Sequence, residues 1–495
     1  MQIYQKMKTF HILIYGCQMN YSDSARIKAI LTNCWMAYVD NIESADIVIF
    51  DTCSVRQKSE EKIFGKLMLI RPEQKVWMTG CMIQHNLRNT KINKQKTGKI
   101  SKNMTWNFVG NISTNEPQIV WFGNFEEELK TVTNRENVLY INTSYNPLWD
   151  KIHNSYNNVE LFFRIDDTWF LSYICHRLWY QDIHIDPNTI NEYNWIIPHD
   201  ANQLLKENLK TAFVPISTGC NQFCAYCIVP YARWLEKNRL IEDILAEVRH
   251  HISLWICEIV LLWQIVNKHP DFVQICKDIL AIDWLKWLRY TSPYPTYYTA
   301  ELLQLHQDES KMCPHIHMPL QSGSTNILKK MFRGYDADQY HQFVDNIRWL
   351  SRKISITSDI IVWFCDESDE DFAESVNMID FAKFDQVYIG MYSPRPGTIA
   401  AKKYIDNISR ETKKSRRDTL NNKLISISKE NNTLEVWSNR EVIINAKLKN
   451  DKYIWYADNM KNVVIDNPWY DLSIWQFVNV NIYDCEAFKL FAKVV

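Results

Sequence analysis

The sequence predicts an α/β protein built from an N-terminal parallel α/β domain, a partial (β/α) barrel and a small C-terminal β-barrel. Two stretches, residues 1–134 and 206–400, alternate between strand and helix patterns, which is typical of parallel sheets with helical crossovers. From residue 432 the pattern changes to short strands at close spacing, which is typical of a small β-barrel. A basic helix over 401–431 connects these last two parts.

The overall composition is that of an ordinary globular protein. The 495 residues suffice for about three domains, and 46% are hydrophobic while 23% are charged, which excludes a disordered chain. No apolar run is long enough to span a membrane, and the first ten residues lack the apolar stretch of a secretory signal. We therefore expect a cytoplasmic protein without a membrane partner. With a net charge of −1, nucleic-acid binding would depend on local basic patches.

Three isolated cysteines follow predicted strands of the N-terminal domain. Strand patterns cover residues 10–15, 46–50 and 75–79, with a helical pattern between the first two. Cys17, Cys53 and Cys81 each come just after one of these strands. Because ligands of parallel sheets bind beyond the carboxyl ends of the strands, we expect the fold to bring the three cysteines together.

Two stretches of the first 205 residues show no clear architecture. Residues 84–105 hold six Lys or Arg and no acidic residue. A solvated loop is the simpler interpretation of that stretch, and an RNA-facing loop is the alternative. Residues 135–205 are rich in Asn, Tyr, Trp and Asp without a period, and we interpret them as a linker or insertion.

The second half contains about six β–α units and then a change of pattern. Strand patterns begin with FVPIS and EIVLL and end with QVYIGMYS, which suggests a complete or open parallel barrel. Residues 401–430 then hold nine Lys or Arg against four acidic residues, and their net charge is +5. The short strands expected after them are LEVWS, REVIINAKL, YIWYA, NVVID, FVNVNIY and FKLFAKVV.

The most specific chemical signal is a C-x3-C-x2-C loop. Cys220, Cys224 and Cys227 lie within GCNQFCAYC, directly after the first predicted barrel strand. Three thiolates on one short loop can hold three irons of a [4Fe–4S] cluster and leave the fourth iron open. The alternative is a zinc site, but no fourth ligand stands at zinc spacing. Buried apolar positions are expected for most of the others: Cys34, Cys175, Cys257, Cys276, Cys313, Cys365 and Cys485.

The motifs around these cysteines carry a family resemblance. GCNQFCAYCIVPYAR at 219–233 resembles the signature of radical S-adenosylmethionine (radical SAM) enzymes. With YGCQMN, DTCSVR, TGCMIQ, HIHMPLQSGS and YSPRPGT in order, the chain resembles methylthiotransferases of the MiaB type over residues 8–130 and 211–495. The final barrel resembles a TRAM domain, an RNA-binding module.

The resemblance implies a tRNA-2-methylthio-N6-dimethylallyladenosine synthase activity. A methylthio group would be added at C2 of the N6-isopentenyl adenosine next to the tRNA anticodon. One S-adenosylmethionine would methylate a sulfur, and a second would be cleaved reductively to give the radical that removes hydrogen from C2. The implied partners are the anticodon stem-loop of tRNA and an electron donor such as a flavodoxin or ferredoxin. The sulfur donor is not identified, and a monomer is expected.

The resemblance also implies the cofactors and the residues that hold them. The family uses two [4Fe–4S] clusters, here one on Cys220, Cys224 and Cys227 and an auxiliary one on Cys17, Cys53 and Cys81. The implied contacts of S-adenosylmethionine are Tyr226, Gln264, Asn267, Gln321, Ser322, Gly323, Ser358 and Asp359. The alternative for these eight residues is a structural role in turns and strand ends.

Tryptophan stands where the family motifs have glycine. Trp234 lies in PYARW, Trp263 in LLWQIVN and Trp363 in IIVWF. The chain has 19 tryptophans and only 11 glycines, against the roughly 35 glycines expected from average usage. The same replacement is expected at Trp35, Trp77, Trp255, Trp455 and Trp475, and is considered at Trp284, Trp437 and Trp469.

We hypothesise that these positions are glycine in the protein, because the source reads UGA codons as glycine. Glycine serves where the backbone approaches another group closely or takes a positive φ, and a tryptophan there would overpack the site. The alternative is a diverged relative that tolerates the tryptophans.

Three rival functions follow from the same motifs. The nearest is a methylthiotransferase that acts on threonylcarbamoyladenosine in tRNA. A non-catalytic iron–sulfur or RNA-binding protein is expected if the tryptophans are genuine and fill the cofactor pocket. A zinc-binding structural protein is the third.

Overall fold

The structure is a computed structural model and divides into two compact units. Unit 1 comprises residues 1–201 and 228–235, and unit 2 comprises residues 202–227 and 236–495. The described residues are 7–53, 57–83, 119–121, 152, 155–156, 158–163, 165, 168, 171, 210–233, 235–406, 408–444, 446–447, 452–466, 472–473 and 476–495. Among them, no helix is both long and apolar enough to cross a membrane.

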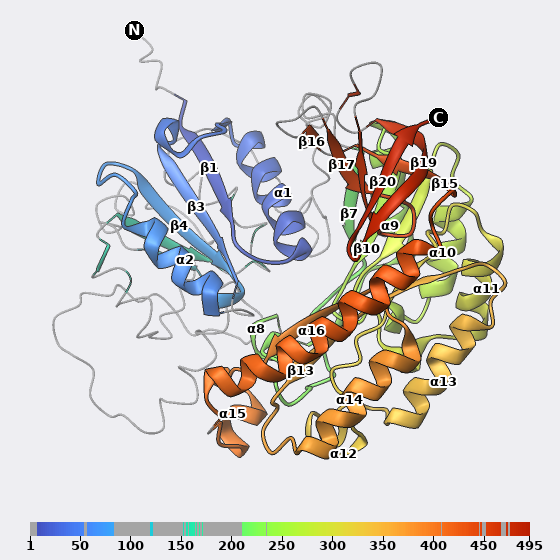
Figure 1. Ribbon diagram of the computed structural model, residues 1–495. Helices are drawn as coiled ribbons and strands as arrows, with labels where there is room; N and C mark the ends of the chain where they lie inside the picture. The colour runs from blue at the N-terminus through green and yellow to red at the C-terminus, as the bar shows by residue number, and fades with distance from the viewer. Residues whose placement is uncertain are drawn as a thin grey trace, which may run out of the picture. The chain divides into compact units, whose positions relative to one another are not determined.

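Unit 1 is a mainly parallel sheet in the order β2-β1-β3-β4-β6-β5 (Figure 1). Its strands are β1 (Thr9–Ile14), β2 (Ala37–Tyr38), β3 (Ile47–Thr52), β4 (Lys75–Gly80), β5 (Ile119–Trp121) and β6 (Val159–Phe163), and only β5 is antiparallel to its neighbour. All six residues of β3 are buried, as expected for a strand covered on both faces. This sheet confirms the predicted parallel α/β domain.

Helices cover both faces of this sheet. Helix α1 (Gln18–Asn33) packs Ile27 and Leu31 against one face, and α2 (Gln57–Leu67) packs Ile63 and Leu67 against the other. A short 3-10 helix, η1 (Ile42–Ser44), lies between β2 and β3, and the four-residue α8 (Val229–Ala232) also belongs to this unit. Strand β6 lies in the range without a period, 135–205, and pairs with β4. Part of that range therefore completes the first sheet.

Unit 2 contains a six-stranded partial barrel, which confirms the predicted (β/α) architecture. Parallel sheets β7-β10-β11 and β12-β13-β14 are joined by a parallel bridge between Leu288 and Met312. The strands are β7 (Thr211–Pro215), β10 (Glu258–Leu262), β11 (Trp287–Tyr290), β12 (His315–His317), β13 (Ser355–Val362) and β14 (Gln386–Met391). A short hairpin, β8 (Ser217–Thr218) with β9 (Lys237–Asn238), follows β7.

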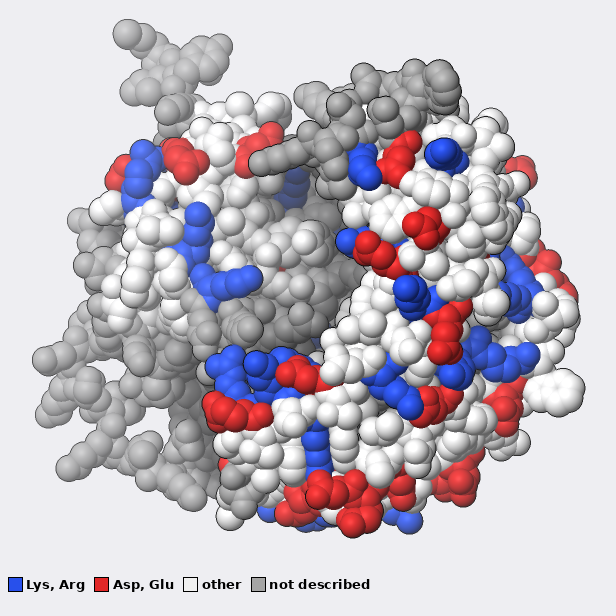
Figure 2. All heavy atoms as spheres, in the orientation of Figure 1, with Lys and Arg blue, Asp and Glu red and all other residues white. Residues whose placement is uncertain are grey.

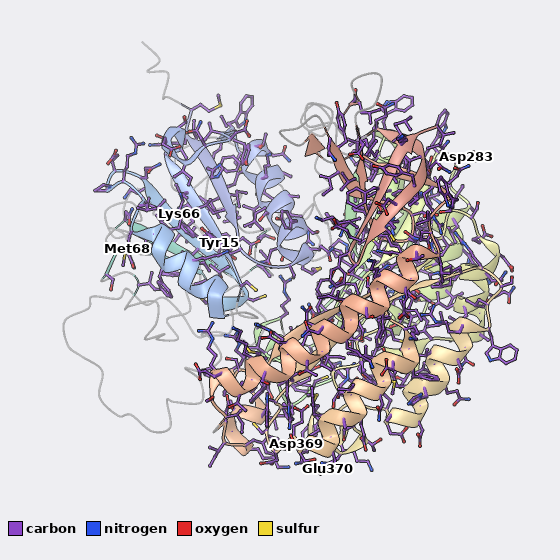
Figure 3. The ribbon with its side chains drawn as sticks, in the orientation of Figure 1. Tyr15, Lys66, Met68, Asp283, Asp369 and Glu370 are labelled. Carbon is purple, nitrogen blue, oxygen red and sulfur yellow. The ribbon has the colours of Figure 1, made fainter. Side chains whose placement is uncertain are left out.

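Helices follow the barrel strands and cover their outer side (Figure 1). They are α9 (Ile241–Ser253), α10 (Phe272–Leu280), α11 (Ala300–Asp308), α12 (Thr325–Lys330), α13 (Ala337–Arg348), α14 (Asp369–Ala382) and α15 (Ile399–Lys403), with 3-10 helices η4 (Val266–Lys268) and η5 (Pro295–Tyr297). Asp369 and Glu370 lie at the beginning of α14, where carboxylates oppose the positive end of the helix dipole (Figure 3).

The basic stretch forms one long helix, α16 (Arg410–Thr433), capped by the Ser409 side chain. Lys413 near its beginning donates to the carbonyl of Tyr392, which directly follows β14. Near its other end, the Asn432 amide donates to the carbonyls of Glu486 and Ala487 in the last hairpin. Helix α16 therefore runs from the carboxyl end of β14 to the C-terminal sheet.

The C-terminal sheet is a curled six-stranded sheet in the order β15-β19-β20-β18-β17-β16. Its strands are β15 (Asn439–Ile443), β16 (Ala446–Lys447), β17 (Tyr453–Tyr456), β18 (Asn462–Ile465), β19 (Phe477–Glu486) and β20 (Lys489–Val494). A bridge between Val442 and Ala457 links β15 to the end of β17 and nearly closes the barrel. The strand expected at LEVWS is wrong, because residues 434–437 form the turn that ends α16.

A buried arginine fixes the C-terminal sheet to the amino ends of barrel strands. Arg289 donates from Nε to Glu258 at 2.6 Å, and its other nitrogens donate to the carbonyls of Asp458 and Ala457 at 2.7 and 3.0 Å. Trp287 packs edge-on against Phe477 at 4.9 Å between ring centres. The C-terminal sheet thus contacts the amino ends of the barrel strands, which lie opposite the carboxyl ends where ligands bind.

Two helices end in the backbone motif that normally requires glycine. Trp35 follows α1 with φ 61°, and Trp255 follows α9 with φ 65°. In each case this residue's N–H bonds to the carbonyl three residues back, and the next N–H bonds to the carbonyl five residues back. These are the two bonds of a Schellman motif, whose left-handed residue is usually glycine. Trp284, Trp363 and Trp437 also have positive φ, at 68°, 56° and 70°.

The other suspect tryptophans differ. Trp77 lies fully buried in β4 within the core and has an ordinary φ, so its geometry does not require glycine. Trp455 lies in β17 with its side chain outside the described residues. Trp234, Trp469 and Trp475 lie outside the described residues altogether.

We expect Trp35→Gly and Trp255→Gly each to raise the free energy of unfolding by about 1–2 kcal/mol, because a left-handed residue with a Cβ costs that much. Little burial is lost, since the two side chains are 68% and 61% exposed. Urea denaturation measures the change. The control is Trp349→Gly at the end of α13, where φ is −72° and glycine should not stabilise. A lower stability for the first two variants would contradict the prediction.

Candidate functional site

The three isolated cysteines of unit 1 lie at the carboxyl ends of adjacent parallel strands. Cys17 follows β1 and caps α1, while Cys53 and Cys81 directly follow β3 and β4. Cys17 is exposed, whereas Cys53 and Cys81 are buried. Burial is the main cause that raises the pKa of Cys81 to about 12; the Arg233 guanidinium opposes this shift, and Cys17 and Cys53 contribute to it. The structure therefore brings three cysteines that are far apart in the sequence to the same edge of one sheet.

A buried polar network supports these cysteines. The Asn20 amide accepts the Cys17 N–H at 3.1 Å and donates to Asp51 at 2.7 Å. Ser24 donates to the other oxygen of Asp51 at 3.0 Å. Burial raises the pKa of Asp51 to about 8, and the neighbouring Asp23 adds to the shift. Because Asn20 belongs to YGCQMN and Asp51 to DTCSVR, the network explains why these motifs extend beyond their cysteines.

Gly80, just before Cys81, occupies a position that only glycine fits. Its φ is +92°, and a Cβ there would lie 2.3 Å from the Thr52 carbonyl oxygen. A close approach of β3 and β4 at their carboxyl ends depends on this residue.

Arg233 extends the network to a cysteine sulfur. The residue is only 6% exposed, and its segment, 228–235, belongs to unit 1. Its Nε lies 3.2 Å from the Sγ of Cys81, and an Nη donates to Asp23 at 2.6 Å. The guanidinium thus connects a buried carboxylate to a thiol.

In unit 2, the second set of cysteines lies on the loop that follows β8. Cys220 and Cys224 are buried and Cys227 is half-buried. The Cys227 N–H bonds to the Cys224 carbonyl at 2.9 Å, and the Ala225 N–H bonds to the Met331 carbonyl at 2.9 Å. These bonds make the loop compact. Burial raises the pKa of Cys220 to about 11.

Arg333 contacts this loop in the way that Arg233 contacts Cys81. One Nη lies 3.5 Å from the Cys224 Sγ and 3.5 Å from the Tyr226 hydroxyl. The guanidinium also lies over the rings of Tyr294 and Tyr335, at 4.3 and 5.0 Å from their centres. Burial raises the pKa of Tyr226 well above its usual range, so the phenol stays neutral.

Each cysteine set offers the number of thiols that a [4Fe–4S] cluster with one open iron uses. Among the described residues, no three His, Cys, Asp or Glu side chains converge closely enough to hold one ion. A cubane cluster needs thiolates around it on separate irons, and each set offers three. None of the described cysteines forms a disulfide.

Several predicted contacts of S-adenosylmethionine meet where the chain after β12 runs beside the second half of β13. The Gln321 N–H bonds to the Asp359 carbonyl at 2.7 Å, and its own carbonyl accepts the Ile361 N–H at 2.9 Å. Ser358 is fully buried and donates to the Met318 carbonyl at 2.8 Å. Its hydroxyl therefore stabilises the turn after β12.

Other predicted contacts have structural partners in unit 2. Gly323 lies so close to α14 that a Cβ would be 2.4 Å from the Glu374 carbonyl oxygen. Its N–H donates to the Ser375 hydroxyl, which also lies 3.4 Å from the buried Ser322 hydroxyl. The Asn267 amide exchanges two hydrogen bonds with the backbone of Tyr294, at 3.0 and 2.8 Å. The side chain of Gln264, which follows β10, is half-buried.

One pair of polar side chains at this end of the barrel was not predicted together. His317 Nε2 lies 2.9 Å from a carboxylate oxygen of Asp359, and His317 Nδ1 lies 2.9 Å from the Thr357 hydroxyl. The side chains of His317 and Asp359 are 17% and 38% exposed, so both can reach a ligand. The motif HIHMPLQSGS contains His317, but nothing in the sequence pairs it with Asp359.

Trp263 directly follows β10 and is 2% exposed. Within the described part of the chain, its indole nitrogen is buried and has no hydrogen-bond partner. Trp363, after β13, instead donates to the Thr412 carbonyl at 2.9 Å and lies beneath the Arg416 guanidinium at 3.4 Å from its ring centre. The indole nitrogen of Trp363 therefore has a hydrogen-bond partner, whereas that of Trp263 has none within the described residues.

A cavity elsewhere in unit 2 does not involve the cysteines. It measures about 130 Å³, and its lining includes Arg348, Lys353, Asp385, Glu435 and Lys461. Lys461 pairs with Asp385 at 2.8 Å and Lys353 with Glu435 at 3.0 Å, whereas Arg348 donates to backbone carbonyls.

Known proteins are similar to this chain over nearly its whole length. Residues 9–100 match the Uncharacterized protein family UPF0004, and residues 214–379 match the Radical SAM superfamily. A tRNA-2-methylthio-N(6)-dimethylallyladenosine synthase of Dictyoglomus thermophilum is 32% identical over 90% of this chain and 89% of its own length. The protein of that name from Acetivibrio thermocellus is 29% identical over 99% of this chain and 92% of its own.

Among solved structures, the radical S-adenosylmethionine methyltransferase TsrM from Kitasatospora setae, with tryptophan substrate and a SAM analog bound, is similar to this chain. Its sequence identity is 12% and its TM-score is 0.46, over 80% of this chain and 75% of that one.

Proposed function

The chain belongs to the family of radical S-adenosylmethionine methylthiotransferases of the MiaB type, and we propose that it adds a methylthio group to C2 of N6-dimethylallyladenosine next to the tRNA anticodon. Its cofactors are S-adenosylmethionine and [4Fe–4S] clusters. The observation that carries the proposal is the pair of cysteine sets, one at the carboxyl ends of β1, β3 and β4 and one on the loop after β8. Each set offers three thiols, which leaves one iron of each cluster open.

The residues around the cysteines have defined tasks in this proposal. Cys220, Cys224 and Cys227 would hold the cluster that supplies the electron for cleavage of S-adenosylmethionine, and Cys17, Cys53 and Cys81 would hold the cluster that presents sulfur. Arg333 holds Cys224 and Tyr226 through its two contacts, so Tyr226 can face the adenine of S-adenosylmethionine. His317 and Asp359 offer a partly exposed donor and acceptor at the same end of the barrel. Gln321, Ser322, Gly323 and Ser358 shape the turn beside them.

RNA binding is assigned to α16 and the C-terminal sheet. Lys and Arg side chains gather over the beginning of α16 (Figure 2). The exposed cations there include Lys402, Lys403, Arg410 and Lys414. Since α16 links the C-terminal sheet to the carboxyl end of β14, its cations can contact the backbone of an anticodon stem whose base reaches the barrel. The TRAM-like sheet would bind the same stem.

The remaining partners follow from this activity. A flavodoxin or ferredoxin would donate the electron, and the enzyme would work as a monomer in the cytoplasm.

Nucleoside analysis of tRNA tests the proposal. The chain, carrying Trp234→Gly and Trp263→Gly, is produced in a strain that lacks its own methylthiotransferase but makes N6-dimethylallyladenosine. We expect hydrolysed tRNA to contain the 2-methylthio derivative by mass spectrometry, and none with Cys224→Ala. A methylthio mark on threonylcarbamoyladenosine would contradict the substrate, and unmodified tRNA would favour a non-catalytic protein.

A further inference from the structure

One charged contact in unit 1 lies outside the roles assigned so far. The Arg233 guanidinium touches the sulfur of Cys81, which is one of the three thiols expected to hold the auxiliary cluster. Arg233 and Cys81 lie 152 positions apart in the sequence, and both are buried. A buried cation beside a thiol requires an explanation, because removing a guanidinium from water is costly unless partners compensate.

The compensation for Arg233 is divided between two groups. Asp23, which is 2% exposed, accepts one Nη at 2.6 Å, and Cys81 faces Nε at 3.2 Å. Arg26 also approaches Asp23, at 3.7 Å, but from a position 17% exposed. The carboxylate therefore holds the guanidinium in one orientation, with its Nε hydrogen directed at the sulfur.

We propose that Arg233 is a positioning residue that raises the reduction potential of the cluster held by Cys17, Cys53 and Cys81. When Cys81 ligates iron it is a thiolate, and the contact becomes a charge-assisted hydrogen bond. Hydrogen bonds to ligand sulfurs and nearby positive charge stabilise the reduced, more negative cluster, because they offset the added electron. The inference rests on the proposed function, which assigns these cysteines to a cluster.

Arg233 lies close in the sequence to the cysteines of the C-x3-C-x2-C loop. Arg233 follows Cys227 by six residues, so the segment that ends the C-x3-C-x2-C loop also supplies the donor to Cys81. A change at Arg233 therefore acts on the auxiliary cluster and leaves every cysteine of the loop in place. Arg333, at 3.5 Å from Cys224, supplies the corresponding contact in unit 2.

The test isolates the auxiliary cluster. Full-length protein carrying Cys220→Ala, Cys224→Ala and Cys227→Ala is reconstituted anaerobically, and its iron and sulfide are measured. A redox titration followed by electron paramagnetic resonance then gives the potential with and without Arg233→Gln. We expect the substitution to favour the oxidised cluster at least tenfold, which is a shift of 59 mV to more negative potential for a one-electron couple.

Three further variants separate this effect from a purely structural role. Arg233→Lys keeps the charge and should retain part of the shift. Arg26→Gln removes a more exposed cation that approaches Asp23 at 3.7 Å, so it should change the potential less than Arg233→Gln. Asp23→Asn removes the carboxylate of the pair and should shift the potential in the positive direction. Opposite signs for the two members of the pair indicate electrostatic coupling to the cluster.

The outcomes are distinguishable. If the triple alanine protein contains no iron and sulfide, the assignment of Cys17, Cys53 and Cys81 fails, and the proposed function fails with it. If its cluster is intact and the potential is unchanged in Arg233→Gln, the inference is overturned while the proposed function stands. If Arg233→Gln cannot hold a cluster, Asp23→Asn decides, and an unchanged potential in that variant overturns the inference.

Discussion

Replacing Trp263 by glycine is expected to raise the affinity for S-adenosylmethionine at least tenfold. Trp263 directly follows β10, at the end of the parallel strands where ligands bind, and its indole is packed there with only 2% of the residue exposed. The buried indole nitrogen lacks a partner in the described structure, which costs about 1–3 kcal/mol. Glycine removes both the volume and the unpaired donor.

Titration calorimetry and the paramagnetic resonance of the reduced cluster measure this change. S-adenosylmethionine should perturb the signal of the Trp263→Gly protein and hardly affect that of the protein with Trp263. Trp349→Gly is the control, because Trp349 is 86% exposed at the end of α13. Equal affinity in all three proteins would contradict the prediction.

Mass spectrometry of the native protein tests directly whether these positions hold glycine or tryptophan. Peptides that cover residues 258–268 and 230–240 should contain glycine at positions 263 and 234. Five tryptophans at positive φ support this expectation, because two of them occupy the left-handed position of a Schellman motif. Tryptophan in both peptides, together with no gain from Trp263→Gly, would favour a cluster-binding or RNA-binding protein without catalysis.

The fold could be predicted from periodic patterns, and exceptions have physical reasons. The strand before Cys53 is apolar throughout because helices cover both faces of β3, and this made it recognisable. Tyr15, labelled in Figure 3, belongs to the strand predicted over residues 10–15, but β1 ends one residue earlier, at Ile14. Strand β6 was not predicted, because it is short and lies in an aperiodic range. LEVWS alternates like a strand, yet buried Glu435 pairs with Arg440 and turns the chain at the end of α16.

The site could be predicted only where chemistry and spacing coincide in the sequence. Spacing alone reveals the three cysteines on one loop and the three cysteines that follow predicted strands. The contacts of Arg233 with Cys81 and of His317 with Asp359 join residues that are distant in sequence and depend on tertiary packing. Asn267 and Ser358, predicted as cofactor contacts, use their polar atoms on neighbouring backbone in this structure.

Cys224→Ala is expected to abolish reductive cleavage of S-adenosylmethionine and the methylthio product with it. The loss should exceed the roughly 10–100-fold effect of losing an outer-shell partner, because a cluster ligand itself is removed. Cys224 is buried at the centre of the loop, and no other described cysteine belongs to that loop besides Cys220 and Cys227. Formation of 5′-deoxyadenosine with dithionite as reductant, followed by chromatography, measures the step.

Cys257→Ala provides the matched control for this loss. Cys257 is half-buried before β10, contacts the Trp255 carbonyl at 3.4 Å, and belongs to neither cysteine set. Its variant should cleave S-adenosylmethionine at the parental rate. Iron content separates the two sets further, because Cys224→Ala should lose iron from one cluster and keep the iron on Cys17, Cys53 and Cys81. Cleavage that survives in Cys224→Ala would mean that the loop does not bind the electron-donating cluster, and the radical mechanism would then lack its starting point.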